Sequence, residues 1–80
     1  MIKVLVTGGA GFIGSAVVPE LLAQDFEVSV VDDLSFGNRE FLDLEKVELI
    51  EADIRNAQRM EGVFSQVKPD YVVHLAAVHF

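Results

Sequence analysis

The fold is decided by the stretch Val4-Leu5-Val6-Thr7-Gly8-Gly9-Ala10-Gly11-Phe12-Ile13-Gly14, in which an apolar run leads into closely spaced glycines. Gly9, Gly11 and Gly14 form the pattern G-x-G-x-x-G, and Gly8 in place of Gly9 gives G-x-x-G-x-x-G. The first glycines let the backbone turn where a Cβ would clash, Gly11 leaves room for a phosphate, and Gly14 lets a helix pack close to the strand. The stretch therefore predicts a strand, a tight turn and a helix whose free N–H groups face an anion.

The residues on either side of this stretch strengthen the prediction. Residues 2–6 are a β-rich apolar run, residues 12–23 have a helical apolar stripe, and residues 28–31 form a second apolar run that ends in Asp32. An acidic residue about 20 positions after the glycines is the third condition for a dinucleotide-binding βαβ unit. The alternative is a glycine-rich turn that holds no ligand.

The second half of the chain repeats the alternation of strand and helix. A loop over residues 34–45 with one helical turn is expected to lead to a third strand at 47–51. Asn56 is expected to cap a second helix, and Pro69 to end it. A fourth, almost fully apolar strand covers residues 71–75.

Strands that are apolar on both faces and separated by helices indicate a parallel sheet covered on two sides. The expected fold is α/β, a three-layer Rossmann-type fold, of which the chain forms the N-terminal βαβ-βαβ half with strand order 3-2-1-4. The chain reverses direction between strands one and four, and ligands bind in the crevice at that point. We expect residues 1–80 to form one nucleotide-binding unit.

The composition limits the partners of the chain. It has 80 residues, 51% of them hydrophobic, and a net charge of −7 from 13 acidic and 6 basic residues. Such a charge repels nucleic acid and anionic membrane surfaces, so a nucleotide has to be held by local backbone dipoles. No apolar run is long enough to cross a bilayer, and no signal peptide is recognisable. The absence of cysteine excludes disulfides and fits a cytoplasmic protein.

Four segments along the chain together carry a family resemblance. They are Thr7-Gly8-Gly9-Ala10-Gly11-Phe12-Ile13-Gly14, Asp32-Asp33-Leu34-Ser35-Phe36-Gly37-Asn38, Ala52-Asp53-Ile54-Arg55-Asn56 and His74-Leu75-Ala76-Ala77. In this order they resemble the N-terminal signatures of extended short-chain dehydrogenase/reductases, in particular the NAD-dependent nucleotide-sugar epimerases and dehydratases of the UDP-glucose 4-epimerase type. The resemblance covers essentially all 80 residues.

The resemblance implies a role for each segment. The glycine segment would hold the pyrophosphate of NAD, and Asp32 the adenosine ribose hydroxyls; a carboxylate there repels a 2′-phosphate and so favours NAD over NADP. Asp33 is equally well explained as a loop start or helix cap. The candidate NAD-binding residues of these first two segments are Gly8, Gly11, Phe12, Ile13, Gly14, Asp32, Asp33, Leu34, Ser35, Gly37 and Asn38.

The later two segments would complete the NAD site. Asp53 would accept a hydrogen bond from the adenine amino group with help from the backbone of Ile54, although an Asp before a helix is also common as a capping residue. Leu75, Ala76 and Ala77 would let the backbone pass beneath the ribose and nicotinamide half of the cofactor.

Neither histidine is predicted to be catalytic or to bind a metal. His74 lies in an apolar strand, where a hydrogen-bonded structural role is expected, and His79 follows it by five residues without a helical H-x-x-x-H arrangement. Tyr71 does not match the catalytic tyrosine of the family that the chain resembles. That tyrosine is followed by a lysine four positions later, and position 75 here is Leu.

In the family that the chain resembles, hydride transfer uses a Tyr-x-x-x-Lys pair, which is absent from these 80 residues. We therefore expect the N-terminal NAD-binding portion of an NAD-dependent nucleotide-sugar epimerase or dehydratase, whose complete form binds a nucleotide sugar and is a homodimer. The alternative is a stand-alone minimal nucleotide-binding module without catalysis. An uncovered fourth strand, which leads to self-association, would argue against the alternative.

Overall fold

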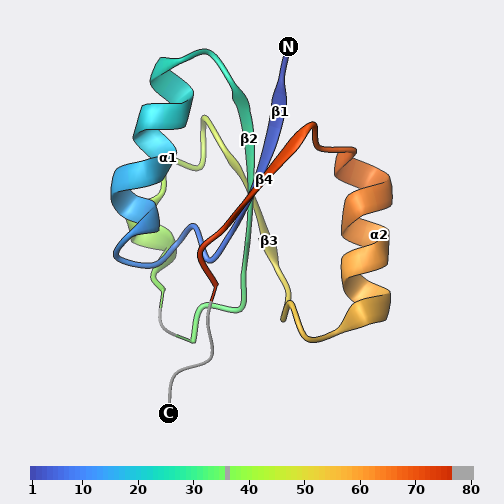
Figure 1. Ribbon diagram of the computed structural model, residues 1–80. Coiled ribbons are helices and arrows are strands. Elements are labelled where there is room, and N and C mark those ends of the chain that lie inside the picture. The colour runs from blue at the N-terminus through green and yellow to red at the C-terminus, as the bar shows by residue number, and fades with distance from the viewer. Residues whose placement is uncertain (36, 77–80) are drawn as a thin grey trace.

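The chain forms an open parallel sheet with helices on both faces (Figure 1). The computed structural model describes residues 1–35 and 37–76. The strand order is β3-β2-β1-β4, which confirms the order predicted from the sequence. The strands are β1 (Lys3–Thr7), β2 (Glu27–Asp32), β3 (Glu48–Glu51) and β4 (Tyr71–His74).

β1 lies at the centre of the sheet and sets the register of its two neighbours. It pairs in parallel with β2 from Lys3 opposite Glu27 onward, and with β4 from Val4 opposite Tyr71 onward. The carboxyl ends of all four strands therefore meet at one edge, the lower edge in Figure 1. The direction of winding reverses between β1 and β4, so the crevice expected in a doubly wound sheet opens at this edge.

Helices α1 (Gly14–Ala23) and α2 (Ala57–Val67) lie on opposite faces of the sheet (Figure 1). α2 begins where predicted, because the Asn56 side chain accepts a hydrogen bond of 3.0 Å from the backbone N–H of Arg59. It ends where Lys68 adopts a left-handed conformation, with φ of 50°, just before Pro69. The predicted helical turn in the loop is the short 3₁₀-helix η1 (Arg39–Phe41).

The first helix begins two residues later than the sequence predicted. Phe12 and Ile13 are still in a turn conformation, and they follow a tight turn over residues 8–11 that a hydrogen bond from the Gly11 N–H to the Gly8 carbonyl oxygen closes (3.2 Å). The Gly11 carbonyl oxygen then accepts from the Ser15 N–H at 3.0 Å, and regular helix starts at Gly14. A helical apolar stripe does not distinguish such a turn from the first turn of the helix.

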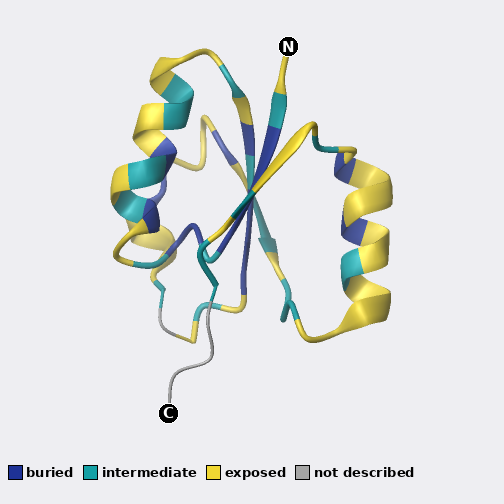
Figure 2. Ribbon diagram, in the orientation of Figure 1, coloured by how far each residue is buried: buried dark blue, intermediate teal, exposed yellow. Residues whose placement is uncertain are grey.

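Two apolar clusters hold the layers together, and Figure 2 shows them as the dark strands and inner helix faces. Val4 and Val6 point toward α1, whereas Leu5 between them points toward α2, as the alternation of a strand requires. The cluster on the α1 side is formed by Val4, Val6, Ala10, Val18, Val28, Val30, Leu42 and Val47. The cluster on the α2 side is formed by Leu5, Val31, Val63 and Val67.

β4 is less well covered than β1 and β2 (Figure 2). Tyr71 is 64% exposed and Val72 is 46% exposed. The exposed apolar strand expected from the sequence is thus present, and the self-association that it would cause stays a prediction. Within the described residues, neither helix combines the length and apolar composition needed to cross a membrane.

The buried centre of the sheet predicts where substitutions destabilise the chain. Leu5→Ala removes a fully buried side chain from the α2-side cluster and should lower the free energy of unfolding by about 2 to 5 kcal/mol. Leu44→Ala makes the same chemical change at a half-exposed side chain and should cost less than about 0.5 kcal/mol. Urea denaturation of both variants measures the difference, and equal losses would contradict the assigned core.

Candidate functional site

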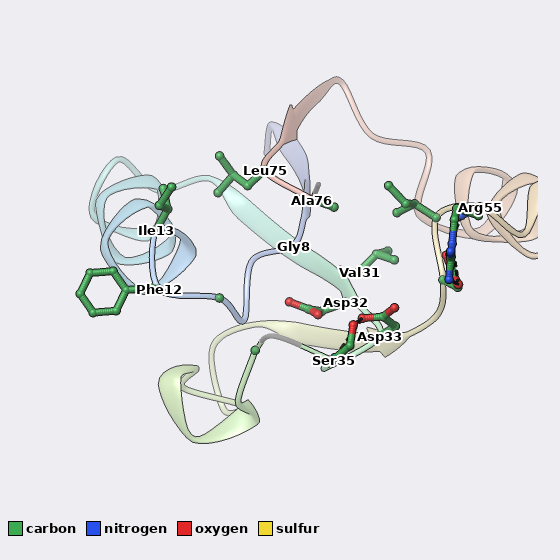
Figure 3. A pocket seen from close by; sticks show the side chains of 14 residues that line it. Gly8, Phe12, Ile13, Val31, Asp32, Asp33, Ser35, Arg55, Leu75 and Ala76 are labelled. Atoms are coloured by element: carbon green, nitrogen blue, oxygen red, sulfur yellow. Dashed lines mark hydrogen bonds and ion pairs between the residues drawn. The ribbon is translucent and has the colours of Figure 1, made fainter. Parts of the chain in front are cut away.

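A pocket of about 380 Å³ opens at the carboxyl edge of the sheet (Figure 3). Its walls come from the turn after β1, the end of β2 and the segments after β2, β3 and β4. Most of the candidate residues predicted from the sequence line it. They are Gly8, Gly11, Phe12, Ile13, Asp32, Asp33, Ser35, Gly37, Asp53, Ile54, Leu75 and Ala76.

Three predicted residues lie outside the lining, and a fourth cannot be placed. Leu34 packs against the apolar cluster on the α1 side of the sheet. Asn38 caps η1, since its side chain accepts a hydrogen bond of 2.9 Å from the Glu40 N–H. Gly14 lies behind the turn, and Ala77 lies outside the described residues. These placements assign Leu34, Asn38 and Gly14 to supporting the pocket wall.

The glycines of the turn have separate roles. Gly8 has φ of +74°, and a Cβ there would lie 2.7 Å from the backbone nitrogen of Ala76. A Cβ on Gly9 would collide with Val30 of β2. Gly14 was expected to allow close packing of helix against strand, but its close approach is to the backbone of Gly9 within the turn. These three glycines are required by the packing of the chain on itself.

Gly11 is different, because the fold leaves room for a side chain there. A Cβ on Gly11 would meet only the Gly8 carbonyl oxygen, at 3.3 Å, and Gly11 lines the pocket. A larger residue would therefore take up space in the pocket and would require only a small shift of the Gly8 carbonyl group. The absence of a side chain at Gly11 therefore keeps this part of the pocket open.

The start of α1 presents backbone donors to the pocket. Ile13 is the N-cap residue and makes no side-chain cap hydrogen bond. Among the described residues, no backbone hydrogen bond uses the N–H of Phe12, Ile13 or Gly14. The Phe12 ring, 86% exposed, points away from the other labelled residues (Figure 3). Unpaired N–H groups and the positive end of the helix dipole suit an anion such as a phosphate.

Asp32 lies at the end of β2 and is only 8% exposed. Its Oδ2 accepts a hydrogen bond from the Ala10 N–H at 3.0 Å, and its Oδ1 accepts one from the Leu34 N–H at 2.8 Å. An ionised carboxylate has about four lone-pair sites, so each oxygen can accept one further hydrogen bond. Asp32 can therefore bind hydroxyl groups while it holds the backbone.

Asp53, after β3, is paired with a residue that the sequence analysis did not assign to the site. Arg55 donates from Nε to both carboxylate oxygens, at 3.0 and 3.1 Å, and from Nη2 at 2.7 Å. The backbone N–H of Arg55 donates to the same carboxylate at 2.8 Å. These hydrogen bonds lower the pKa of Asp53 to about 2 and raise the pKa of Arg55.

Asp33 contributes to the local turn as well as to the pocket wall. It accepts hydrogen bonds from the Ser35 hydroxyl and, at 3.0 Å, from the Ser35 N–H. The hydroxyl bond is the main cause that lowers the pKa of Asp33. Three carboxylates thus line one side of the pocket, and Arg55 is the one basic side chain among the described lining residues.

Val31 and the two histidines remain to be placed relative to the pocket. Val31, a buried residue of β2, lines the pocket next to Asp32 and was assigned from the sequence only to the strand. His74 makes the predicted structural hydrogen bond, which is partly buried, with 2.6 Å between its Nδ1 and the Thr7 Oγ1. His79 lies outside the described residues.

Known proteins are similar to this chain in sequence and architecture. The model of the NAD dependent epimerase/dehydratase family matches residues 4–80. The dTDP-glucose 4,6-dehydratase 1 of Escherichia coli K12 is 51% identical over 82 residues, which cover 94% of this chain and 22% of that protein. The UDP-glucose 4-epimerase of Mycolicibacterium smegmatis is 44% identical over 79 residues, which cover 94% of this chain and 25% of that protein.

Solved structures agree with these matches. The UDP-glucose 4-epimerase of Thermus thermophilus, crystallised with NAD, superposes with a TM-score of 0.91 at 44% identity. The match covers 96% of this chain and 24% of that structure. The chain thus spans about a quarter of the length of the relatives that it matches. The family model covers nearly all of the chain, which belongs to the NAD-dependent epimerase/dehydratase family.

Proposed function

We propose that the chain binds NAD in the pocket at the carboxyl edge of the sheet, as the N-terminal part of an NAD-dependent nucleotide-sugar epimerase or dehydratase. The observation that carries the proposal is the bare backbone of Gly11 in the pocket wall, where a Cβ would meet only the Gly8 carbonyl oxygen, at 3.3 Å, and a larger side chain would take up pocket space. Beside it lie the N–H groups of Phe12 and Ile13, without backbone partners among the described residues. This arrangement suits a pyrophosphate.

The remaining walls suit the two halves of the dinucleotide. Asp32 has capacity for two hydroxyl hydrogen bonds from the adenosine ribose, and its charge would repel the 2′-phosphate of NADP. Asp53 and Ile54, which line the same pocket, would contact the adenine, and Asp33 and Ser35 would flank it. Leu75 and Ala76, followed by Ala77, would lie under the ribose and nicotinamide half. NAD bound in this way would accept a hydride from the substrate.

For the whole protein we propose an isomerase or oxidoreductase of nucleotide-sugar metabolism. The relatives named above act, by name, on UDP-glucose or dTDP-glucose, and they are about four times as long as this chain. A Tyr-x-x-x-Lys pair outside residues 1–80 would move the proton, and a nucleotide sugar would be the substrate. We further propose a cytoplasmic homodimer that binds neither nucleic acid nor membranes, in keeping with the net charge of −7.

The pyrophosphate assignment is tested by filling the space at Gly11. Gly11→Val should weaken NAD binding to the 80-residue chain at least about tenfold, which corresponds to about 1.4 kcal/mol, because the side chain occupies the phosphate position. Gly62→Val is the matched control, since a Cβ at Gly62 in α2 has nothing within 4 Å. Calorimetric titration with NAD measures both affinities, and thermal melting verifies that both variants fold. Equal affinity of Gly11→Val and the control would refute the assignment.

The ion pair between Asp53 and Arg55, at the end of the pocket proposed for the adenine, is tested by replacing Arg55. In the intact chain an NMR titration should place the Asp53 pKa at about 2, and Arg55→Gln should raise that pKa toward its ordinary value of 3.8. Because the pKa is depressed in the folded chain, ionised Asp53 favours folding at pH values above about 4, and this contribution disappears as the pH falls toward 2.

Arg59→Gln is the control, because it removes the same charge from α2 without touching Asp53. It should leave the Asp53 pKa near 2. An unchanged pKa in Arg55→Gln would mean that Arg55 does not hold the carboxylate in solution.

A further inference from the structure

The peptide units of Ala10 are held from both sides by the segment that begins at the end of β2. The Ala10 N–H donates to Asp32 Oδ2 at 3.0 Å in a buried hydrogen bond. The Ala10 carbonyl oxygen accepts from the Asn38 N–H at 2.9 Å. We call this set of contacts between Asp32, Ala10 and Asn38 the Ala10 clasp. It joins the glycine turn to residues 22 and 28 positions later in the sequence.

Asp32 connects the clasp to a second point of the same segment. Its other oxygen, Oδ1, accepts from the Leu34 N–H at 2.8 Å. Figure 3 shows Asp32 between the turn that carries Gly8 and the segment that carries Ser35. Hydrogen bonds to a charged acceptor are about twice as strong as neutral ones, so the buried carboxylate is a firm link between the phosphate side and the adenosine side of the pocket.

Gly37 makes room for the clasp. A Cβ there would lie 2.8 Å from both the carbonyl carbon and the carbonyl oxygen of Ala10, and 2.9 Å from Asp32 Oδ2. These atoms are backbone or already engaged in hydrogen bonds, so they cannot move aside without opening the contacts. The contacts of such a Cβ show that glycine at position 37 is required by the space beside the clasp.

We propose that Asp32 and Gly37 are positioning residues that act through Ala10: they set the shape of the glycine turn and so the affinity for the pyrophosphate. The inference rests on the proposed binding of NAD. It differs from the role of Asp32 as a ribose ligand, which predicts that a change at this end alters the preference between NAD and NADP. A clasp that shapes the turn predicts that NAD and NADP lose affinity together, because they share the pyrophosphate.

The test compares Gly37→Ala with Gly62→Ala in the 80-residue chain. Gly37→Ala adds one methyl against the clasp, 2.9 Å from Asp32 Oδ2, so the exchange of the Ala10 N–H and the ligand affinities are read together, whereas Gly62→Ala adds the same methyl in open space. NMR hydrogen exchange reports the Ala10 N–H directly, with the Val63 N–H in α2 as an internal reference for global stability. Calorimetry gives the affinities for NAD, NADP and ADP.

Gly37→Ala should speed exchange of the Ala10 N–H at least about tenfold relative to Val63. It should weaken NAD, NADP and ADP by a common factor of about ten, and Gly62→Ala should change none of these values. Exchange of Ala10 as slow as in the control would overturn the clasp. A change confined to the ratio of NAD to NADP would overturn its action on the pyrophosphate.

Asp32→Asn provides a second variant if Gly37→Ala does not fold. The amide offers one oxygen to two N–H donors, so either Ala10 or Leu34 should lose protection while Val63 keeps it. Retained protection at both would contradict the clasp. Failure of the intact chain to bind NAD would instead contradict the proposed function, and the exchange measurements would still decide whether the clasp exists.

Discussion

The packing of the glycine turn onto the ends of the strands is the constraint on which the rest of the structure depends. Gly8 touches the backbone of Ala76 after β4, and Gly9 touches Val30 of β2. Gly14 in turn sits against the backbone of Gly9, which holds the start of α1 close to the glycine turn. A side chain at any of these positions would lift the turn, and the unpaired N–H groups at the start of α1 would no longer face the pocket.

This geometry explains how an acidic chain can suit an anionic ligand. With 13 acidic and 6 basic residues, the overall field opposes the approach of a pyrophosphate. The side proposed for the pyrophosphate has backbone N–H groups without backbone partners among the described residues, and the carboxylates of Asp32 and Asp53 lie toward the end proposed for the adenosine, where hydroxyl and amino groups would donate hydrogen bonds. Arg55 neutralises part of this charge through its contacts with Asp53. Separation of the two kinds of wall would orient an asymmetric ligand as well as hold it.

Periodicity and turn residues were sufficient to predict the alternation of strands and helices and the cap at Asn56, because these depend on local patterns. The strand order followed from the doubly wound arrangement that this alternation implies. Most of the pocket lining was predicted from the family resemblance of the four segments. The start of α1 was misplaced since the turn at Phe12 and Ile13 has the same apolar spacing as a helix. Arg55 was missed because the direction of a long side chain depends on its partner. The signal for it was its position two residues after Asp53, where a carboxylate commonly binds the following backbone N–H. Val31 was missed because an apolar residue near the end of a buried strand does not reveal in the sequence that it lines a pocket.

The hydrogen bond between Asp32 and Ala10 gives a physical reason why the two halves of the sequence pattern belong together. An acid about 20 residues after the glycines is usually explained by its contact with the ribose, a contact that would not constrain the turn. Here the same carboxylate also holds the peptide N–H at the centre of the turn, while Gly37 and Asn38 close over the other side. Replacement of Asp32 by a small or basic residue would then remove a support of the phosphate site along with a ribose contact. A change of cofactor preference at this position would need a new acceptor for the Ala10 N–H in addition to a new partner for the 2′-phosphate.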